Sequence, residues 1–476
     1  MSTASETRTE LVKGLGPVSA TAIVMGSMIG SGIFIVSADI ARQVGSPGML
    51  LVVWGLAAFM TLVGALSYGE LAAAMPHAGG QYVYLRESLG PLSGFLYGWT
   101  LFLVIQTGTV AAVAVAFAKF AGVFVPSISS RPLLSLGAFD VSSQQLVAIA
   151  CLILLTVINC MGLRLGALVQ NLFTFAKTAA LLGLIVLGYL YGRNATAQSA
   201  NFGEHFWSGA SFNLQTVYLV AAAMVGALFA SDAWNNITFT AAEVKKPHRD
   251  VPLALLVGAG TVLVLYLAAN VVYLNVLPLA GQPQGETALA RGIDHAAEDR
   301  VAAAAAQVIL GPRAELVMAA FIMISTFGCA NGLILAGARV YYAMARDGLF
   351  FPFAAALHPV SRVPVAALIL QCVWSCLLTL SGTYSDLLDY VIFAVLLFYV
   401  LTIAGLFRLR RTQPSLHRPY RAFGYPLLPA LYIMLALLID GAMLVAKPVY
   451  AGVGLVIVLL GVPVYFVLRK VFETGG

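Results

Sequence analysis

Apolar runs of helical length follow one another along almost the whole chain, separated by glycine, proline or charged residues. A helix that crosses the apolar core of a membrane needs about 20 such residues. The pattern predicts about twelve spanning helices, at residues 17–41, 49–75, 91–125, 144–162, 166–191, 213–242, 252–277, 314–345, 363–381, 385–407, 424–446 and 449–468. The shorter alternating segments of a membrane β-barrel are absent from the sequence, so an all-α integral membrane protein is expected.

Composition narrows the class of protein further. Of the 476 residues, 60% are hydrophobic and 10% are charged, whereas a soluble domain is about 45–50% apolar and about 25% charged. Too few polar side chains are present to cover a water-facing surface, which excludes a soluble enzyme, a nucleic-acid-binding protein and a disordered chain. The five cysteines all lie in apolar runs, so we expect small buried residues rather than disulfides or metal ligands.

The basic residues indicate which ends of the spans face the cytoplasm. The chain carries 26 Lys and Arg against 20 Asp and Glu, a net charge of +6. With the N-terminus inside, most of the basic residues fall in inner loops, above all at 245–249 and 408–421. The positive-inside rule favours this threading. It predicts cytoplasmic termini, a cytoplasmic N-terminal segment at 1–16 and a helical extracellular loop at 278–313, and it explains the net charge without an anionic partner.

Glycines cluster in the middle of the first span, in the sequence MGSMIGSGIF. Gly26 and Gly30, four residues apart, would allow close packing of a second helix. Gly30 and Gly32, on either side of Ser31, would instead favour a break in the helix. A break leaves N–H groups that suit a carboxylate and carbonyls that suit an ammonium group. The spacing alone leaves both interpretations open.

The sixth span contains a carboxylate among small residues, in the sequence GALFASDAWNN. A charge at this depth is costly, and it usually marks a transport pathway or a charge pair. Interrupted spans at corresponding places in two halves are typical of transporter binding sites. The first and sixth spans are five apart, as two inverted repeats of five helices require. The alternative is that Asp232 is a hydrogen-bonded structural acid.

Lys177 lies more than one turn inside the fifth span, in the sequence QNLFTFAKTAALLG. Its ammonium group must be paired, bonded to carbonyls or deprotonated by burial. Three interpretations stay open: a fixed internal cation, a proton-binding lysine and a helix-end anchor. Glu70 closes the second span at the inner face, where a contact with a gate or loop is plausible.

Motifs of catalysis are absent from the sequence. All six histidines fall in loops, and no zinc-protease, hydrolase, phosphate-loop or paired-cysteine metal motif occurs. We therefore expect neither an enzyme nor a bound cofactor or metal. A pore would need rings of ligands from symmetric subunits, so two different broken helices in one chain favour a transporter.

Several motifs together resemble the amino acid–polyamine–organocation (APC) superfamily, and within it the L-type amino acid transporters. The match runs through most of the chain. It rests on GSMIGSGIF, GSPGMLLVVW at 45–54, YGELAAAMPHAGGQYVYLRESLGPLSGFLYGW at 68–99, the spacing of Asn159, Gly162, Gly166, Gln170, Asn171 and Lys177, EVKKPHRDVP at 243–252, RVYYAMARDG at 339–348, RPY at 418–420 and GYP at 424–426.

The resemblance implies a LeuT-type fold, with inverted repeats at 17–191 and 213–409 and two peripheral helices at 424–470. It also implies alternating access around a site in the middle of the membrane. Carried over by position, the N–H groups of Ser31 and Gly32 would hold the substrate carboxylate, with Gly30 permitting close approach. The carbonyls of Met28, Ile29, Phe229, Ala230 and Asp232 would hold its ammonium group. Phe229 would also be the outer gate, followed by Trp234 as a gating residue and Asn235 in the side-chain pocket.

Lys177 matches the lysine that, in sodium-independent members, occupies the place of the sodium ion in sodium-coupled relatives. Ser325 and Thr326 of the eighth span are its expected neighbours. The chain departs from the resemblance at Ser231, where many members have an aromatic residue, and at Ala233, where many have glycine. Asp232 is also not what most L-type members carry, and it would favour cationic substrates or bind a proton if it faced the site.

The leading hypothesis is sodium-independent exchange of neutral L-amino acids across the plasma membrane. The alternatives are a proton-coupled symporter, with Asp232 or Lys177 as the proton site and cationic substrates included, and a non-transporting nutrient sensor. Animal L-type transporters attach a heavy subunit through a cysteine near 126–143, where this sequence has none. We therefore expect the chain to act without a disulfide-linked partner.

Overall fold

The computed structural model describes residues 10–136, 139–208, 210, 213–381, 384–446 and 448–474. In this part of the chain ten helical segments are long and apolar enough to cross a membrane. They are formed by α1 (Pro17–Met28) with α2 (Gly32–Ile35), α4 (Pro47–Ala74), α6 (Pro91–Thr100) continued through η1 (Leu101–Ile105) into α7 (Gln106–Phe124), α8 (Ser143–Cys160), α9 (Leu163–Tyr191), α13 (Pro247–Val276), α16 (Ala314–Arg346), α18 (Tyr384–Thr412), α19 (Leu427–Ala446) and α20 (Pro448–Thr474).

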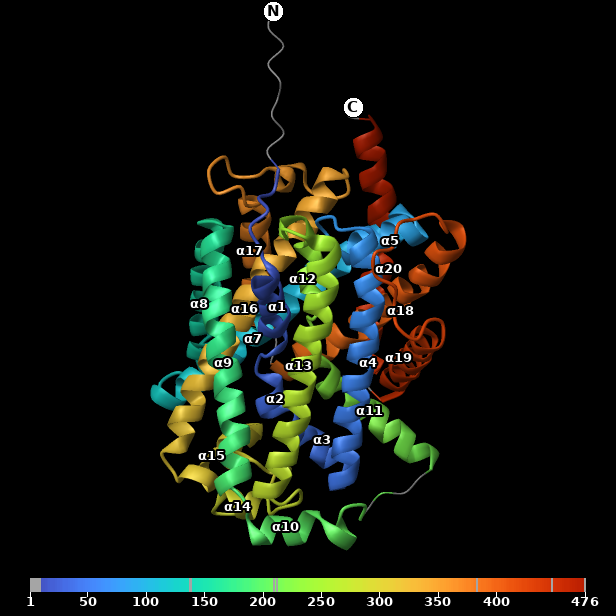
Figure 1. Cartoon of the computed structure of the whole chain (residues 1–476). Coiled ribbons are helices and arrows are strands. Elements are labelled where there is room, and N and C mark those ends of the chain that lie inside the picture. Colours follow the sequence, from blue (N-terminus) through green and yellow to red (C-terminus); the bar gives the residue numbers. More distant parts are fainter. Residues whose placement is uncertain are drawn as a thin grey trace, which may run out of the picture.

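Two shorter apolar helices, α11 (Leu214–Ala230) and α17 (Val365–Ser381), lie where the sequence predicts the sixth and ninth spans. After α11 the sixth span continues into α12 (Asn236–Phe239) and η3 (Ala241–Glu243). The prediction of an all-α integral membrane protein is confirmed. Figure 1 shows the helices as one bundle, with the described N-terminal segment and the last turn of α20 at the same end, as an even number of spans requires.

The connections carry the smaller elements. The stretch at 278–313, which the sequence predicts to be helical, contains α14 (Ala288–Arg291), η4 (Ala297–Asp299) and α15 (Val301–Leu310), and α15 packs against α2, α9, α13 and α16. The other connecting elements are α3 (Ser37–Val44), α5 (Gln81–Leu89), α10 (Ala195–Asn201), η2 (Gly203–His205) and η5 (Pro352–Ala355). An antiparallel hairpin that the sequence did not predict, β1 (Pro132–Leu136) with β2 (Phe139–Ser142), joins α7 to α8.

The first span lies at the centre of the bundle, where α1 packs against α9, α13 and α16 (Figure 1). Gly26 makes this packing close. A Cβ added at Gly26 would lie 1.9 Å from Nε2 of Gln170 and 2.3 Å from Oγ1 of Thr174, both on α9. The glycine-rich sequence of the first span therefore has both of the features that its spacing left open. It packs closely against α9 through Gly26, and it is broken after Met28.

A buried ion pair joins the segments at the end of the bundle where α1 begins. Arg339 of α16 donates from Nε and Nη2 to the carboxylate of Glu243 at 2.9 and 3.1 Å, and both side chains are 1% exposed. The backbone carbonyl of Glu243 accepts the N–H groups of Gly14 and Leu15, each at 2.9 Å. The chain ahead of α1, the end of the sixth span and α16 are thus held together at one point.

Glu70, at the end of α4, anchors the connection between α18 and α19. Its carboxylate, in a side chain 1% exposed, accepts hydrogen bonds from Nε and Nη2 of Arg410 at 2.9 and 2.6 Å and from the N–H of Ala422 at 2.7 Å. Nε of Arg418 lies 3.3 Å from the same carboxylate. The contact that the sequence placed at Glu70 is therefore with a basic loop.

Candidate functional site

The first and sixth spans are both broken, and the two breaks touch. The helix α1 ends at Met28 and α2 begins at Gly32, while α11 ends at Ala230 and α12 begins at Asn236. A Cβ added at Gly32 would lie 2.6 Å from Cβ of Ala230 and 2.8 Å from its Cα. Only glycine at this position allows the backbones of the first and sixth spans to approach so closely. The first N–H groups of α2 have no acceptor within their helix, so this region suits a negative group.

The ends of the two half-helices present carbonyl groups on the other side of the breaks. Tyr266 of α13, which is 1% exposed, places its hydroxyl 3.0 Å from the carbonyl oxygen of Met28 and 3.2 Å from that of Ala230. A single hydroxyl thus bridges the two broken spans. The sequence did not single out Tyr266, because a tyrosine in an apolar run carries no signal of its contacts.

Lys177 reaches the break from α9. Its Nζ donates hydrogen bonds to the carbonyl oxygens of Gly26 at 2.5 Å and Ile29 at 2.8 Å in the first span, and of Ser325 in α16 at 3.4 Å. The side chain is 1% exposed, so it does not reach the membrane surface as a helix-end anchor would. All three donors of the ammonium group have carbonyl acceptors within reach, which is the arrangement of a fixed internal cation.

The neighbours predicted for Lys177 behave differently from each other. Ser325 donates from its hydroxyl to the carbonyl oxygens of Ile29 and Gly30, each at 3.0 Å, so it binds the break directly. Thr326 is buried, but its hydroxyl bonds to the carbonyls of Ile322 and Met323 in its own helix. Ser325 therefore contacts the break of the first span, while Thr326 bonds within its own helix.

Asp232 lies in the break of the sixth span and faces α18. Its carboxylate accepts a hydrogen bond from the hydroxyl of Tyr399 at 2.6 Å. The next residue, Ala233, has φ of +64°, a left-handed conformation that is uncommon for any residue other than glycine. Asn235 donates from Nδ2 to Oε1 of Gln81 at 3.0 Å. The strained backbone and these side-chain contacts hold the connection between α11 and α12 in an open, non-helical form.

A small cavity lies beside this connection. Its walls come from η1, the α5, α6, α7, α12, α16 and α18 helices and the break of the sixth span, and the polar groups among them are Gln81, Tyr97, Gln106, Thr109, Asp232, Asn235, Asn236 and Tyr399. The wall from η1 is a π-helical turn, a feature that is frequent at functional sites. The sequence predicted Asp232 and Asn235 of this set but gave no sign of the residues from the other helices.

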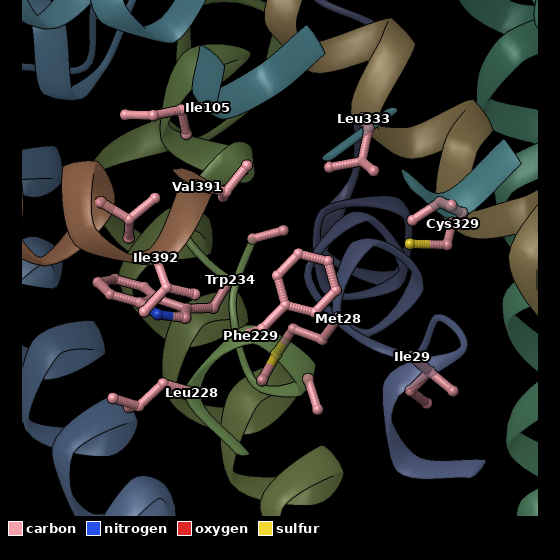
Figure 2. Packing of buried hydrophobic residues seen from close by; sticks show 14 of the residues in the cluster. Met28, Ile29, Ile105, Leu228, Phe229, Trp234, Cys329, Leu333, Val391 and Ile392 are labelled. Atoms are coloured by element: carbon pink, nitrogen blue, oxygen red, sulfur yellow. The ribbon is translucent and has the colours of Figure 1, made fainter. Parts of the chain in front are cut away.

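The aromatic residues predicted to gate the site lie on opposite sides of the break. Figure 2 shows Phe229 beside Met28, where the two broken spans meet, and Trp234 near Ile392 and Leu228. The ring of Trp234 packs edge-on against Tyr68, at 4.8 Å between centroids, and in a tilted arrangement against Tyr399, at 5.2 Å. Trp234 therefore supports the position of Tyr399, whereas Phe229 is close to the region that Gly32 and Met28 define.

Comparison with known proteins identifies the family. A family model described as amino acid permease matches residues 15–474. The chain belongs to the amino acid permease family. It is 32% identical over 461 residues to the large neutral amino acids transporter small subunit 2 of Homo sapiens, covering 96% of this chain and 80% of that protein.

Two further relatives are similar to this permease over nearly its whole length. The Asc-type amino acid transporter 1 of Mus musculus is 31% identical, with coverage of 96% of this chain and 82% of that protein. The b(0,+)-type amino acid transporter 1 of Mus musculus is 28% identical, with coverage of 98% and 90%. The permease is therefore a multi-pass membrane protein that transports amino acids, and the expectations of an L-type APC transporter and of a transporter rather than an enzyme are confirmed.

The described residues hold no group of three or more His, Cys, Asp or Glu side chains that could bind a metal ion. The polar groups at the breaks are instead amides, hydroxyls, carbonyls, one ammonium and one carboxylate. Groups of these kinds suit a zwitterion, because they offer it hydrogen bonds and charges of both signs.

Proposed function

We propose that this permease exchanges amino acids, neutral ones among them, across the plasma membrane without sodium. The observation that carries this proposal is the contact of Lys177 with the carbonyls of Gly26, Ile29 and Ser325. A tethered ammonium group there supplies the positive charge that would otherwise come from a bound cation. The ammonium group of Lys177 joins α9, the broken first span and α16 in every transport cycle, so no bound ion is needed to assemble the site.

In the proposed substrate pose, the amino acid lies between the two breaks. Its carboxylate meets the N–H groups of Ser31 and Gly32 at the start of α2. Its ammonium group meets carbonyls at the ends of α1 and α11, and the carbonyls to which the family resemblance gives this role are those of Met28, Ile29, Phe229, Ala230 and Asp232. The carbonyls of Met28 and Ala230 are oriented by Tyr266, and that of Ile29 by Lys177 and Ser325.

The substrate side chain would extend toward Asn235 and the cavity, because both lie beyond the break of the sixth span. Phe229 would close the site from the outside, and Trp234 would move with the sixth span. Alternating access would come from two inverted repeats, 17–191 and 213–409, with 424–470 peripheral. This is supported by the positions of the two breaks, five spans apart.

The proposed orientation has both termini in the cytoplasm. It is supported by the basic loops at 245–249 and 408–421 and by the shared end of the bundle at which the described chain begins and ends. Under this orientation the connection from α7 to α8 is extracellular. Because it contains no cysteine, we propose that the permease works without a disulfide-linked heavy subunit, although one relative is named as a small subunit.

Proteoliposomes test the proposal most directly. Purified permease is reconstituted with or without an internal amino acid, and uptake of a radiolabelled amino acid is measured with sodium or choline outside. We expect uptake only when internal substrate is present, and the same rate in both salts. Uptake into empty vesicles driven by external acid would replace exchange with proton symport, for which Asp232 and Lys177 are the candidate proton sites. Absence of binding and uptake for every amino acid would overturn the transport site itself.

A further inference from the structure

The end of α18 and the connection from it to α19 carry a concentration of positive charge. This segment contains five arginines: Arg408, Arg410, Arg411, Arg418 and Arg421. No Asp or Glu occurs between residues 390 and 439. Among the described residues, the acidic side chain that pairs with the segment comes from another span, and it is Glu70 of α4. Five positive charges therefore meet one negative charge.

The structure divides the five arginines into two groups. Arg410 donates to the carboxylate of Glu70, and Arg418 lies 3.3 Å from it. Their side chains are 22% and 8% exposed, so both turn inward. The remaining three are exposed: Arg408, Arg411 and Arg421. None of the ion pairs between described residues includes one of these three guanidinium groups.

Acidic side chains on the adjoining elements are paired with another arginine. The α5 helix packs against α18, and its Glu87 forms an ion pair with Arg86 at 2.9 Å. Asp347, directly after α16, pairs with the same Arg86. These two carboxylates therefore do not neutralise the three exposed arginines, whose charge is left for a group outside the chain.

The connection is held in a fixed shape by contacts with its own backbone and with α4. Arg418 donates to the carbonyl oxygens of Leu409 and Gln413, each at 3.0 Å. Glu70 accepts the N–H of Ala422 at 2.7 Å. The exposed arginines thus project from an ordered segment, so a ligand that binds them orders little of the backbone, and this ordering is one of the costs of binding.

The connection lies at the depth of the lipid headgroups, because it joins two helices that cross the membrane. The spanning part of α18 ends at Thr412, and α19 begins at Leu427; α19 is at the edge of the bundle (Figure 1). Two apolar side chains stand out beside the arginines, since Phe423 and Leu427 are each 73% exposed. Basic residues next to exposed apolar ones are typical of a segment at the boundary between headgroups and acyl chains.

We propose that this surface is a binding site for anionic phospholipids. The guanidinium groups of Arg408, Arg411 and Arg421 bind the phosphate of the headgroup, because their planar donors match phosphate oxygens in pairs. Phe423 and Leu427 contact the acyl chains. The positive-inside rule accounts for the side of the membrane on which these arginines lie, but not for the division into inward and exposed groups. The site lies outside the two breaks, so it goes beyond the proposed exchange of amino acids.

The test on the unaltered protein compares two lipids with the same acyl chains. Purified full-length permease in a neutral detergent is titrated with phosphatidylglycerol, which is anionic, or with phosphatidylcholine, which is zwitterionic. Native mass spectrometry counts the bound lipid. We expect phosphatidylglycerol to bind more tightly by about tenfold or more, the scale of three arginines near a charged lipid surface. Equal binding of the two lipids would overturn the site.

Two triple variants locate the site. The first removes the exposed guanidinium groups of the connection: Arg408→Gln, Arg411→Gln and Arg421→Gln. The matched control removes three exposed arginines elsewhere, near the end of the bundle where α1 begins: Arg164→Gln, Arg249→Gln and Arg362→Gln. Both variants lose three positive charges, so an effect of net charge alone is the same in both. We expect the first to lose the preference for phosphatidylglycerol and the control to retain it.

An equal loss in the two variants would overturn the site, because it would report net charge and not these three arginines. If the first variant does not fold, the comparison of the two lipids on the unaltered protein still decides.

Free glycerol phosphate separates a lipid from a soluble phosphate. It carries the same phosphate group but has no acyl chains to contact Phe423 and Leu427. We expect it to leave phosphatidylglycerol bound when both are present at the same concentration. Displacement of the lipid under these conditions would overturn a phospholipid as the occupant.

Discussion

The ammonium group of Lys177 lies 2.8 Å from the carbonyl oxygen of Ile29, at the point where the first span is broken. The carbonyl belongs to a residue that no longer continues the α1 helix, so it has no helical N–H partner. Lys177 supplies that partner from another span. The two residues together fix the shape of the break.

Lys177→Ala is expected to reduce amino acid uptake by about tenfold or more, because it leaves buried carbonyls without a donor and opens the contact between α9 and α1. Uptake into proteoliposomes measures the change. Lys119→Ala is the control. Lys119 lies near the C-terminal end of α7, and its ammonium group donates to the carbonyl oxygen of Glu298. Full uptake by Lys177→Ala would refute the role of a tethered cation.

Gly32→Ala is expected to abolish uptake. The added methyl group would lie 2.6 Å from Cβ and 2.8 Å from Cα of Ala230, so the two broken spans must move apart. Gly55→Ala is the matched control, because no atom lies within 4 Å of the position of its new methyl group. Equal uptake by the two variants would show that the close approach at Gly32 is not required.

Arg339→Ala is expected to lower the stability of the permease by about 3–5 kcal/mol, since it leaves the carboxylate of Glu243 buried and unpaired. The melting temperature in detergent measures the loss. Replacing both partners, Arg339→Met with Glu243→Gln, should recover part of it. Arg346→Ala, at an exposed position later on the same helix, should change stability by less than about 0.5 kcal/mol. A double variant as unstable as Arg339→Ala would argue against the ion pair as the cause.

Ala233→Gly is expected to retain or raise stability. Ala233 has φ of +64°, and a left-handed conformation costs a residue with a Cβ about 1–2 kcal/mol that glycine does not lose. Ala179→Gly, at an exposed position in α9, should instead lose about 1 kcal/mol because glycine weakens a helix. Melting curves of the two variants give the comparison, and a similar loss in both would contradict strain at Ala233.

Much of the architecture could be predicted because lipid imposes strict rules on the chain. Each of the twelve predicted apolar runs coincides with a helical segment of the structure, since backbone groups in lipid must bond within a helix. The same rules made Lys177 and Asp232 conspicuous, because charges inside a span need a special environment. The hairpin of β1 and β2 was missed, because it forms in a connection that these rules do not govern.

Residues that act through distant partners could not be recognised in the same way. Tyr266 and Tyr399 lie in apolar runs, where a tyrosine is common and unremarked, yet one joins the two breaks and the other binds Asp232. Gln81 was visible only as part of a motif, and its bond to Asn235 crosses 154 positions of the chain. No local pattern contains such distances.

The sequence by itself determined the membrane class, the family and the approximate positions of the apolar helices, and it marked the two stretches of small residues where a helix break was one of the interpretations. These properties follow from local composition, because burial in lipid and helix formation act on neighbouring residues. Tertiary structure alone decided that Lys177 binds Ile29, that Tyr266 spans both breaks and that Asp232 faces a cavity away from the first span. Those contacts depend on how α9, α13 and α18 pack around the broken helices, and packing is a property of the whole chain.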